Sequence, residues 1–180
     1  MIKVEIQLII PWGEGPDLGK HYNRLMEGVK DWVCFLDHDI LQLNPSWYTM
    51  LKDAVKRVGQ GAGWITGMTN AIACIHQLDV KAPKNQNIES HMKRAKQRYN
   101  KFGNQLDLID PSSVQLPFSG FMILTHKKAW QAAGGFTSGF LGVDNEYWKA
   151  VVKAGYKTYV MPGLYMYHTY HLKAQWNNWP

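Results

Sequence analysis

Two aspartates directly follow an apolar stretch in the segment Trp32-Val33-Cys34-Phe35-Leu36-Asp37-His38-Asp39. Residues 32–36 are all apolar, with a β-branched and two aromatic members, and predict a short strand buried on both faces. Because ligands of open α/β sheets bind beyond the carboxyl ends of the strands, Asp37 and Asp39 are expected to lie beside a substrate. Carboxylate oxygens suit Mg²⁺ or Mn²⁺ carrying a phosphorylated ligand. On this pattern alone, acids that only cap the following turn are an equally good interpretation.

Asp144 follows the glycine-rich loop Phe136-Thr137-Ser138-Gly139-Phe140-Leu141-Gly142 and begins a predicted helix that ends before Gly155. The helix macrodipole favours an ionised carboxylate at this end, which is the form that a general base needs. A plain N-cap is the alternative. Glu146 is predicted to be a first-turn helix acid and not a catalyst.

Two histidines, His168 and His171, flank Thr169-Tyr170 near the end of the chain. Their spacing brings both to one side of a helical turn, whereas on a strand they would point in opposite directions. Either is a candidate further metal ligand beside Asp39, and each is also consistent with a partly buried polar group. By the same alternation, His38 is predicted to point away from the two acids.

Strands and helices that position these residues alternate along the first half of the chain. Residues 4–10 predict a strand, and apolar residues at helical spacing in 18–29, after the N-cap candidate Asp17, predict a helix. With the strand at 32–36 this makes a right-handed βαβ unit, in which Trp12 neighbours Asp37. Asn44-Pro45 predicts the start of the next helix.

Further strands are predicted at 64–69, 121–125, 157–161 and 164–168, with 71–75 as another strand candidate and a short helix at 127–133. The order predicts one α/β domain over residues 1–180, a Rossmann-like sandwich whose central sheet is mostly parallel and flanked by helices. Residues 79–115 are expected to form a mobile basic excursion over the sheet edge, with a modest helical pattern at 88–102. Residues 172–180, which include Trp176 and Trp179, form a tail.

Composition is that of a globular chain, with 46% hydrophobic and 19% charged residues. Cys34 and Cys74 lie in apolar runs without metal spacing and are expected to be buried, reduced thiols. No apolar run is long enough to span a bilayer and no signal peptide is recognisable, so a cytoplasmic location is expected. The net charge is +6, much of it between Lys81 and Lys101. The stretch 93–98 either grips donor phosphates or an acidic acceptor, or is a solvated helix face; nucleic acid is not an expected partner.

The order of short motifs resembles a family 2 glycosyltransferase of the GT-A fold, in the shortened form that some bacterial viruses encode. The strongest part is the segment from Gly134-Gly135-Phe136 to Gly155-Tyr156. The full set is Leu36-Asp37-His38-Asp39, Asn44-Pro45-x-Trp47, Ser119-Gly120-Phe121-Met122, Ala133-Gly134-Gly135-Phe136, Asp144-x-Glu146, Lys153-Ala154-Gly155-Tyr156-Lys157 and Tyr167-His168.

The resemblance implies roles for these residues. It implies that Asp37 and Asp39 hold the donor ribose and a Mn²⁺ or Mg²⁺ ion, with His168 near the metal. It implies that Asp144 deprotonates an acceptor hydroxyl, so that sugar passes from a nucleotide-sugar donor with inversion. Gly120 matches a small residue that lets the sugar approach the backbone.

The remaining donor-binding candidates lie in the βαβ unit. Asn23, with Gly19 before it, resembles the helix between the donor-binding strands. Pro11 and Trp12 occupy the place of an absent strand that helps relatives to recognise the nucleobase, so Trp12 is a candidate stacking residue.

A second departure from the family is Val143-Asp144, which replaces the family's Glu-Asp pair. The departures leave the donor and the acceptor unnamed and keep two other functions open. One is a sugar nucleotidyltransferase. Such enzymes usually carry a glycine-rich loop with a basic residue after the first strand, whereas here the first basic residue after that strand is Lys20. The other is a non-catalytic module that binds carbohydrate or nucleic acid.

Overall fold

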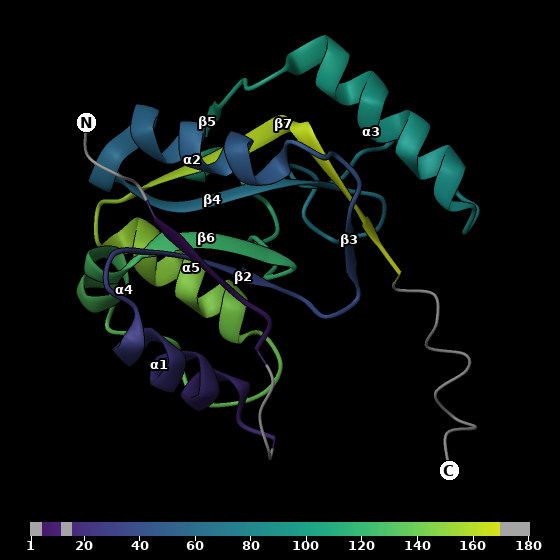
Figure 1. Ribbon diagram of the computed structural model, residues 1–180. Helices are drawn as coiled ribbons and strands as arrows, with labels where there is room; N and C mark the ends of the chain where they lie inside the picture. The colour runs from purple at the N-terminus through teal and green to yellow at the C-terminus, as the bar shows by residue number, and fades with distance from the viewer. Residues whose placement is uncertain (1–4, 12–15, 170–180) are drawn as a thin grey trace.

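Helices lie on both faces of a single sheet in the computed structural model, which describes residues 5–11 and 16–169 (Figure 1). The strands are β1 (Ile6–Ile9), β2 (Trp32–Leu36), β3 (Ile40–Gln42), β4 (Ala62–Thr69), β5 (Asp107–Ile109), β6 (Met122–His126) and β7 (Lys157–His168). The helices are α1 (Leu18–Gly28), α2 (Trp47–Val58), α3 (Ile88–Phe102), α4 (Lys127–Ala133) and α5 (Val143–Lys153).

The sheet is mixed, and the expectation of a mostly parallel sheet is wrong. Its order is β1-β2-β6-β4-β7-β3, with β5 beside β7. Among the strands of the described residues, the pairs β1/β2 and β4/β7 are parallel, while β6 runs antiparallel to both of its neighbours and β3 and β5 run antiparallel to β7. A strand buried on both faces is apolar whichever way it runs, so the hydrophobic pattern of residues 121–125 carried no information about its direction.

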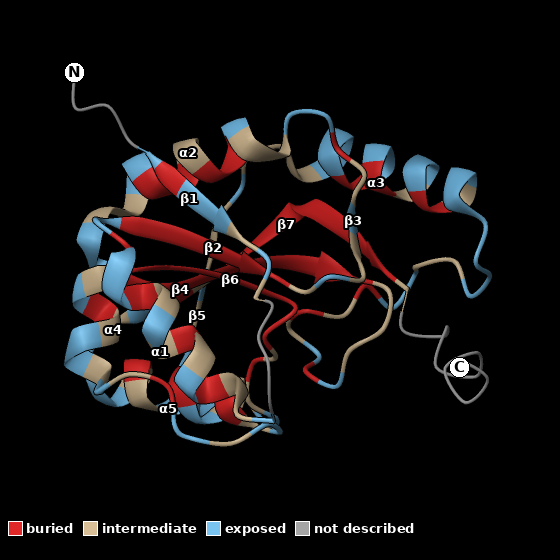
Figure 2. Cartoon of the chain, turned by 60° about the horizontal axis from the view of Figure 1, so that its bottom comes forward, coloured by how far each residue is buried: buried red, intermediate tan, exposed pale blue. Residues whose placement is uncertain are grey.

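Two hydrophobic clusters fill the space between the sheet and its helices. On one face, α2 packs Met50, Leu51, Ala54 and Val55 against the sheet. On the other face lie α1, α4 and α5, with Tyr147 and Val151 among the buried residues. Figure 2 shows the central strands as buried and the outer helix surfaces as exposed. The alternation of buried and exposed residues along α1 and α5 is the amphipathic pattern that the sequence predicts.

Helix α3 lies across β7, in the segment 79–115 that was expected to be a mobile basic excursion with a modest helical pattern. His91, Ala95 and Arg98 are its buried residues, and β5 then joins the sheet as a short edge strand. The helix begins and ends within the predicted range 88–102. Its polar composition hid the packing, because two of the three buried side chains are ionisable and interrupt the apolar pattern.

Strand β7 is continuous, although Pro162-Gly163 suggested two separate strands. Between the pairs Thr66–Val160 and Met68–Tyr165 the register with β4 shifts, so the proline is accommodated in an irregularity of the ladder. A Cβ atom on Gly163 would collide with the carbonyl oxygen of Gly103 at the end of α3. The glycine therefore permits the helix to cross the strand at this point.

Smaller differences concern the ends of elements. Helix α2 begins at Trp47 after Asn44-Pro45, and the strand candidate 71–75 is irregular backbone with bends. Cys34 and Cys74 are both buried and free. Over the described residues, no helix is both apolar enough and long enough to cross a membrane.

Candidate functional site

Asp37 and Asp39 lie in a tight turn between β2 and β3. The backbone N–H of Asp37 donates to the carbonyl oxygen of Phe121 at 3.0 Å, and the N–H of Ile40 donates back to the Asp37 carbonyl at 3.3 Å. The pairing of β3 with β7 then sets Ile40 opposite His168. The turn thus brings the aspartates beside the end of β7.

His168 joins the two acids from the last position of β7. Its Nε2 atom lies 3.2 Å from Oδ1 of Asp39, and the side chain is almost fully buried. The Asn70 side chain holds the backbone of His168, accepting from its N–H at 2.7 Å and donating to its carbonyl at 3.1 Å. Thr169 donates its backbone N–H to the Asp39 carbonyl at 3.0 Å. Hydrogen bonds to the backbones of Asp39 and His168 therefore fix the positions of both residues.

Asp37, Asp39 and His168 form a candidate metal site, since each offers a ligand atom and these atoms lie within 4.8 Å of one another. Neighbouring ligands of an octahedral ion with bonds of about 2.1 Å lie about 3.0 Å apart. The 3.2 Å between Nε2 of His168 and Oδ1 of Asp39 is close to that spacing. Two carboxylates suit Mn²⁺ or Mg²⁺, and the imidazole favours Mn²⁺, because Mg²⁺ prefers oxygen ligands. The residues present therefore fit a divalent cation.

The two carboxylates of this site differ in their pKa values. Burial, together with the nearby charges of Asp39 and Asp144, raises the pKa of Asp37 to about 6, against the lowering effect of His168. The hydrogen bond from His168 lowers the pKa of Asp39. Two acids whose pKa values are pushed apart in this way are typical of functional sites. A divalent ion would favour the ionised form of both.

Asp144 is the second residue of α5, and its carboxylate is held by the start of β6. The backbone N–H of Gly120 donates to Oδ2 of Asp144 at 2.6 Å. A Cβ atom on Gly120 would lie 2.9 Å from Cβ of Asp144. Gly120 is thus small because Asp144 lies against it, a reason different from the approach of a sugar that the resemblance implied.

Tyr22 is a residue of this site that the sequence did not reveal. Its ring is buried, stacked on Phe136 and edge-on to Phe35. Burial, with the charges of Asp37 and Asp144, raises the pKa of its phenol. The helical pattern assigned Tyr22 correctly to the apolar face of α1 but says nothing of where its hydroxyl ends. Asn70 was missed as well, because a polar residue after a strand is usually a turn residue.

The side-chain amide of Asn23 forms hydrogen bonds with other residues of the protein. Its Oδ1 accepts from the N–H of Phe136 at 2.8 Å and from Nε1 of Trp130 at 2.9 Å, while its Nδ2 donates to the Phe136 carbonyl at 2.8 Å. Gly19 likewise permits a close approach, since a Cβ there would collide with the Thr137 carbonyl. These contacts attach the loop before α5 to α1, and they leave the Asn23 amide engaged with protein atoms where a donor-binding role was expected.

The structure places some of the other predicted site residues, and the rest lie outside the residues that it describes. Pro11 follows β1, whose Ile9 is paired with Phe35, so it lies at the same sheet edge as Asp37. Trp12, His171 and the tail at 172–180 lie outside the described residues. Glu146 is half exposed and pairs with Lys149 at 2.6 Å on the surface of α5, in agreement with a first-turn acid.

Comparison with protein-family models and with curated proteins finds no match to this chain.

Proposed function

We propose that the protein is a metal-dependent glycosyltransferase of the GT-A type, which moves a sugar from a nucleotide-sugar to an acceptor hydroxyl with inversion. The observation that carries the proposal is the convergence of Asp37, Asp39 and His168, with Asp144 close enough for its charge to act on Asp37. Three metal ligands and a separate carboxylate are the groups that this reaction needs.

Asp37, Asp39 and His168 would hold the divalent ion, which neutralises the charge of the departing diphosphate. Their carboxylates cannot bind a diphosphate directly, because like charges repel. Asp144 accepts the proton of the acceptor hydroxyl. The hydrogen bond from Gly120 fixes one carboxylate oxygen, which orients the other for that proton transfer.

Inversion follows from the number of acids. A retaining double displacement needs a nucleophilic carboxylate beneath the sugar, and the loop 136–142 contains none. Val143, which stands where relatives carry an additional acid, is buried in the core. A single displacement assisted by Asp144 is therefore the mechanism that these residues support.

Metal dependence tests the function directly. Calorimetry should show that nucleoside diphosphates bind in the presence of Mn²⁺ and lose most of their affinity in chelator. In a panel of nucleotide-sugars, the protein with Mn²⁺ should slowly hydrolyse at least one. Asp39→Asn should abolish the metal-dependent part of binding, because it removes a charged ligand. Asp31→Asn is the matched control, because Asp31 is exposed and lies just before the first residue of β2, whereas Asp37 and Asp39 follow its last residue.

Equal nucleotide affinity in metal and in chelator would contradict the proposal. Formation of pyrophosphate from a nucleoside triphosphate and a sugar phosphate would instead identify a nucleotidyltransferase. Binding of carbohydrate without turnover of any nucleotide-sugar would identify a binding module.

A further inference from the structure

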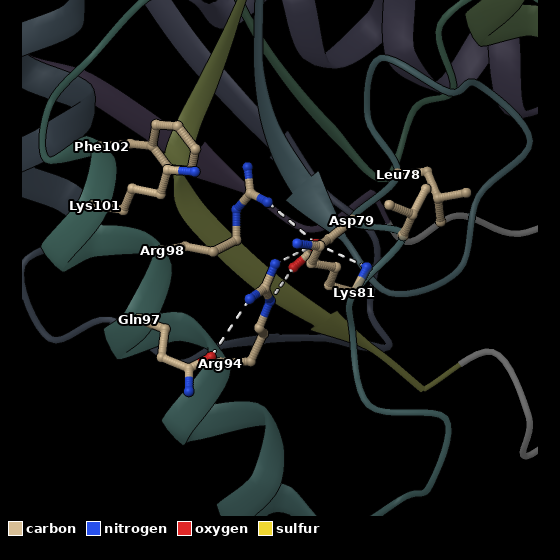
Figure 3. A pocket seen from close by; sticks show the side chains of 9 residues that line it. Leu78, Asp79, Lys81, Arg94, Gln97, Arg98, Lys101 and Phe102 are labelled. Atoms are coloured by element: carbon tan, nitrogen blue, oxygen red, sulfur yellow. Dashed lines mark hydrogen bonds and ion pairs between the residues drawn. The ribbon is translucent and has the colours of Figure 1, made fainter.

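A pocket of about 380 Å³ lies between α3 and the loop that follows β4 (Figure 3). Figure 3 shows the charged side chains of Arg94 and Arg98 extending from the helix towards Asp79 on the facing loop. The residues that decide its chemistry are Asp79, Lys81, Arg94, Arg98 and Lys101.

Two guanidinium groups share one carboxylate at this pocket. Arg94 donates to Asp79 through two nitrogens, at 2.6 and 2.7 Å, and Nη1 of Arg98 lies 3.2 Å from the same carboxylate. The Asp79 side chain is only 2% exposed and that of Arg98 only 10%. One buried negative charge therefore faces two largely buried positive charges, and an unbalanced buried charge is costly.

Additional positive charge at the pocket comes from Lys81 and Lys101, both on the surface. Among the described residues, none of the four basic side chains of the pocket forms an ion pair with any acid other than Asp79. The lining thus carries four positive charges against one negative charge. Asp79 acts as a support, since its carboxylate is already shared by two guanidinium groups.

Positive charge is concentrated around this pocket in the chain as a whole. Residues 81–101 hold seven of the 20 Lys and Arg residues and one of the 14 acids. The remainder of the chain holds 13 of each sign and is neutral, so this one segment accounts for the entire net charge of +6. A local excess of this size attracts anions.

Hydrogen-bond donors are available in the pocket. The guanidinium of Arg98 carries five N–H groups. Its Nε donates to the Pro162 carbonyl at 2.7 Å and its Nη1 faces Asp79. Within the described part of the chain, no protein acceptor is recorded for its Nη2. A fork of guanidinium N–H groups beside flexible ammonium groups is the arrangement that recognises phosphate oxygens.

We propose that this pocket binds a phosphate group of an anionic ligand. The site is separate from the metal site, because Pro162 and His168 are six residues apart on β7, which corresponds to about 20 Å of extended strand. The donor diphosphate proposed for the metal site does not reach it. The inference is independent of the proposed glycosyl transfer, since it needs neither the metal nor turnover.

The test is titration of the full chain with inorganic phosphate and with linear polyphosphate, in excess chelator so that the metal site makes no contribution. Binding should be measurable by calorimetry and should weaken as salt is added. Lys81→Gln with Lys101→Gln should weaken it by about tenfold, because each removes a charged donor and leaves the Arg94–Asp79–Arg98 cluster intact.

The matched control is Lys56→Gln with Lys153→Gln, which removes the same charge from exposed positions on α2 and α5. It should change affinity by less than about twofold. Saturable binding of inorganic phosphate would identify a small phosphorylated ligand, and binding of polyphosphate alone would identify a phosphate polymer. Absence of binding by either probe, or an equal loss in both double variants, would overturn the proposal.

Discussion

Asp144 has two interpretations, as a helix cap and as a base, and its hydrogen bond separates them. A capping carboxylate accepts from the backbone of its own first turn. Here the residue before the helix is Gly142, and Oδ2 of Asp144 accepts instead from the backbone N–H of Gly120, two residues before β6. The carboxylate therefore does not cap α5, and it remains available for the proton transfer proposed above.

Asp144→Asn should lower the transfer rate by about 10²–10⁴-fold, the usual contribution of a general base. The amide oxygen can still accept from Gly120, so the fold and the binding of donor and metal should be nearly unchanged. Steady-state kinetics with calorimetry of donor binding would check both parts. Glu146→Gln, on the exposed side of the same helix, should transfer sugar at a rate close to that of the parent protein.

Parent-like transfer by Asp144→Asn would show that the base lies elsewhere. Retention of the anomeric configuration, detected by NMR of the product, would equally contradict a single displacement assisted by Asp144.

Among the elements, the crossing of α3 over β7 depends on backbone proximity. Gly163 lies against the carbonyl of Gly103, and Arg98 donates to the neighbouring Pro162 carbonyl at 2.7 Å. Neither contact involves an apolar side chain. The position of the helix is therefore sensitive to the smallest change in volume at Gly163.

Gly163→Ala should destabilise the protein by about 1–3 kcal/mol, because the added methyl group overpacks a site where the obstacle is backbone. Gly28→Ala is the control, since a Cβ there meets nothing within 4 Å and alanine is a better helix former. It should be neutral or slightly stabilising. Urea unfolding of both variants would measure this, and equal stability of Gly163→Ala and the parent would contradict the close approach.

Elements with a strong local signal could be predicted from the sequence. Helix α4 occupies the predicted residues, Asp17 caps α1 by accepting from the N–H of Lys20, and β1 and β2 are parallel neighbours. The direction of β6 was not predictable, because this strand is buried on both faces. The packing of α3 was not predictable either, because it depends on two ion pairs that the buried Asp79 forms with Arg94 and Arg98, 15 and 19 residues further along the chain.

The candidate site was predictable to a similar degree. Asp37, Asp39 and His168 lie together. The end of an apolar strand predicted the position of the two acids, whereas the family resemblance alone placed His168 near them. Tyr22 and Asn70 join through tertiary packing, which leaves no local pattern. The donor-binding role of Asn23 was expected from the family resemblance alone, and the hydrogen-bond partners of its amide are more than 100 residues away in the chain.

The whole molecule gathers its chemical residues because the sheet is mixed. Parallel β1 and β2 end at one edge, and antiparallel β6 begins there, which brings Gly120 to the place where β2 ends. In a wholly parallel sheet Gly120 would lie at the opposite edge, away from Asp37. The reversed strand, which the pattern did not predict, is thus what places Gly120 and Asp144 beside the acids.

Accumulating acids at one edge has a cost in stability that depends on pH. Burial raises the pKa of Asp37 from 3.8 to about 6, so between these values the folded chain retains a proton that the unfolded chain has lost. The unfolded state binds fewer protons in that window, and the contribution of Asp37 to stability must therefore fall as pH rises from 4 to 7. A shift of this size corresponds to about 3 kcal/mol at neutral pH.

Asp37→Asn removes this contribution, because the amide cannot ionise. In chelator, the variant and the parent should be equally stable near pH 4, and the variant should be the more stable by up to about 3 kcal/mol at pH 7. Mn²⁺ should reverse the order, since it stabilises the parent through Asp37 and does so more at pH 7 than at pH 5, where protons compete. Denaturant unfolding of both proteins at each pH, with and without Mn²⁺, measures these differences in stability. A parent that is as stable as Asp37→Asn at pH 7 in chelator would contradict the raised pKa of Asp37. A parent that gains no stability from Mn²⁺ would show that the acids at this edge do not form a cation site.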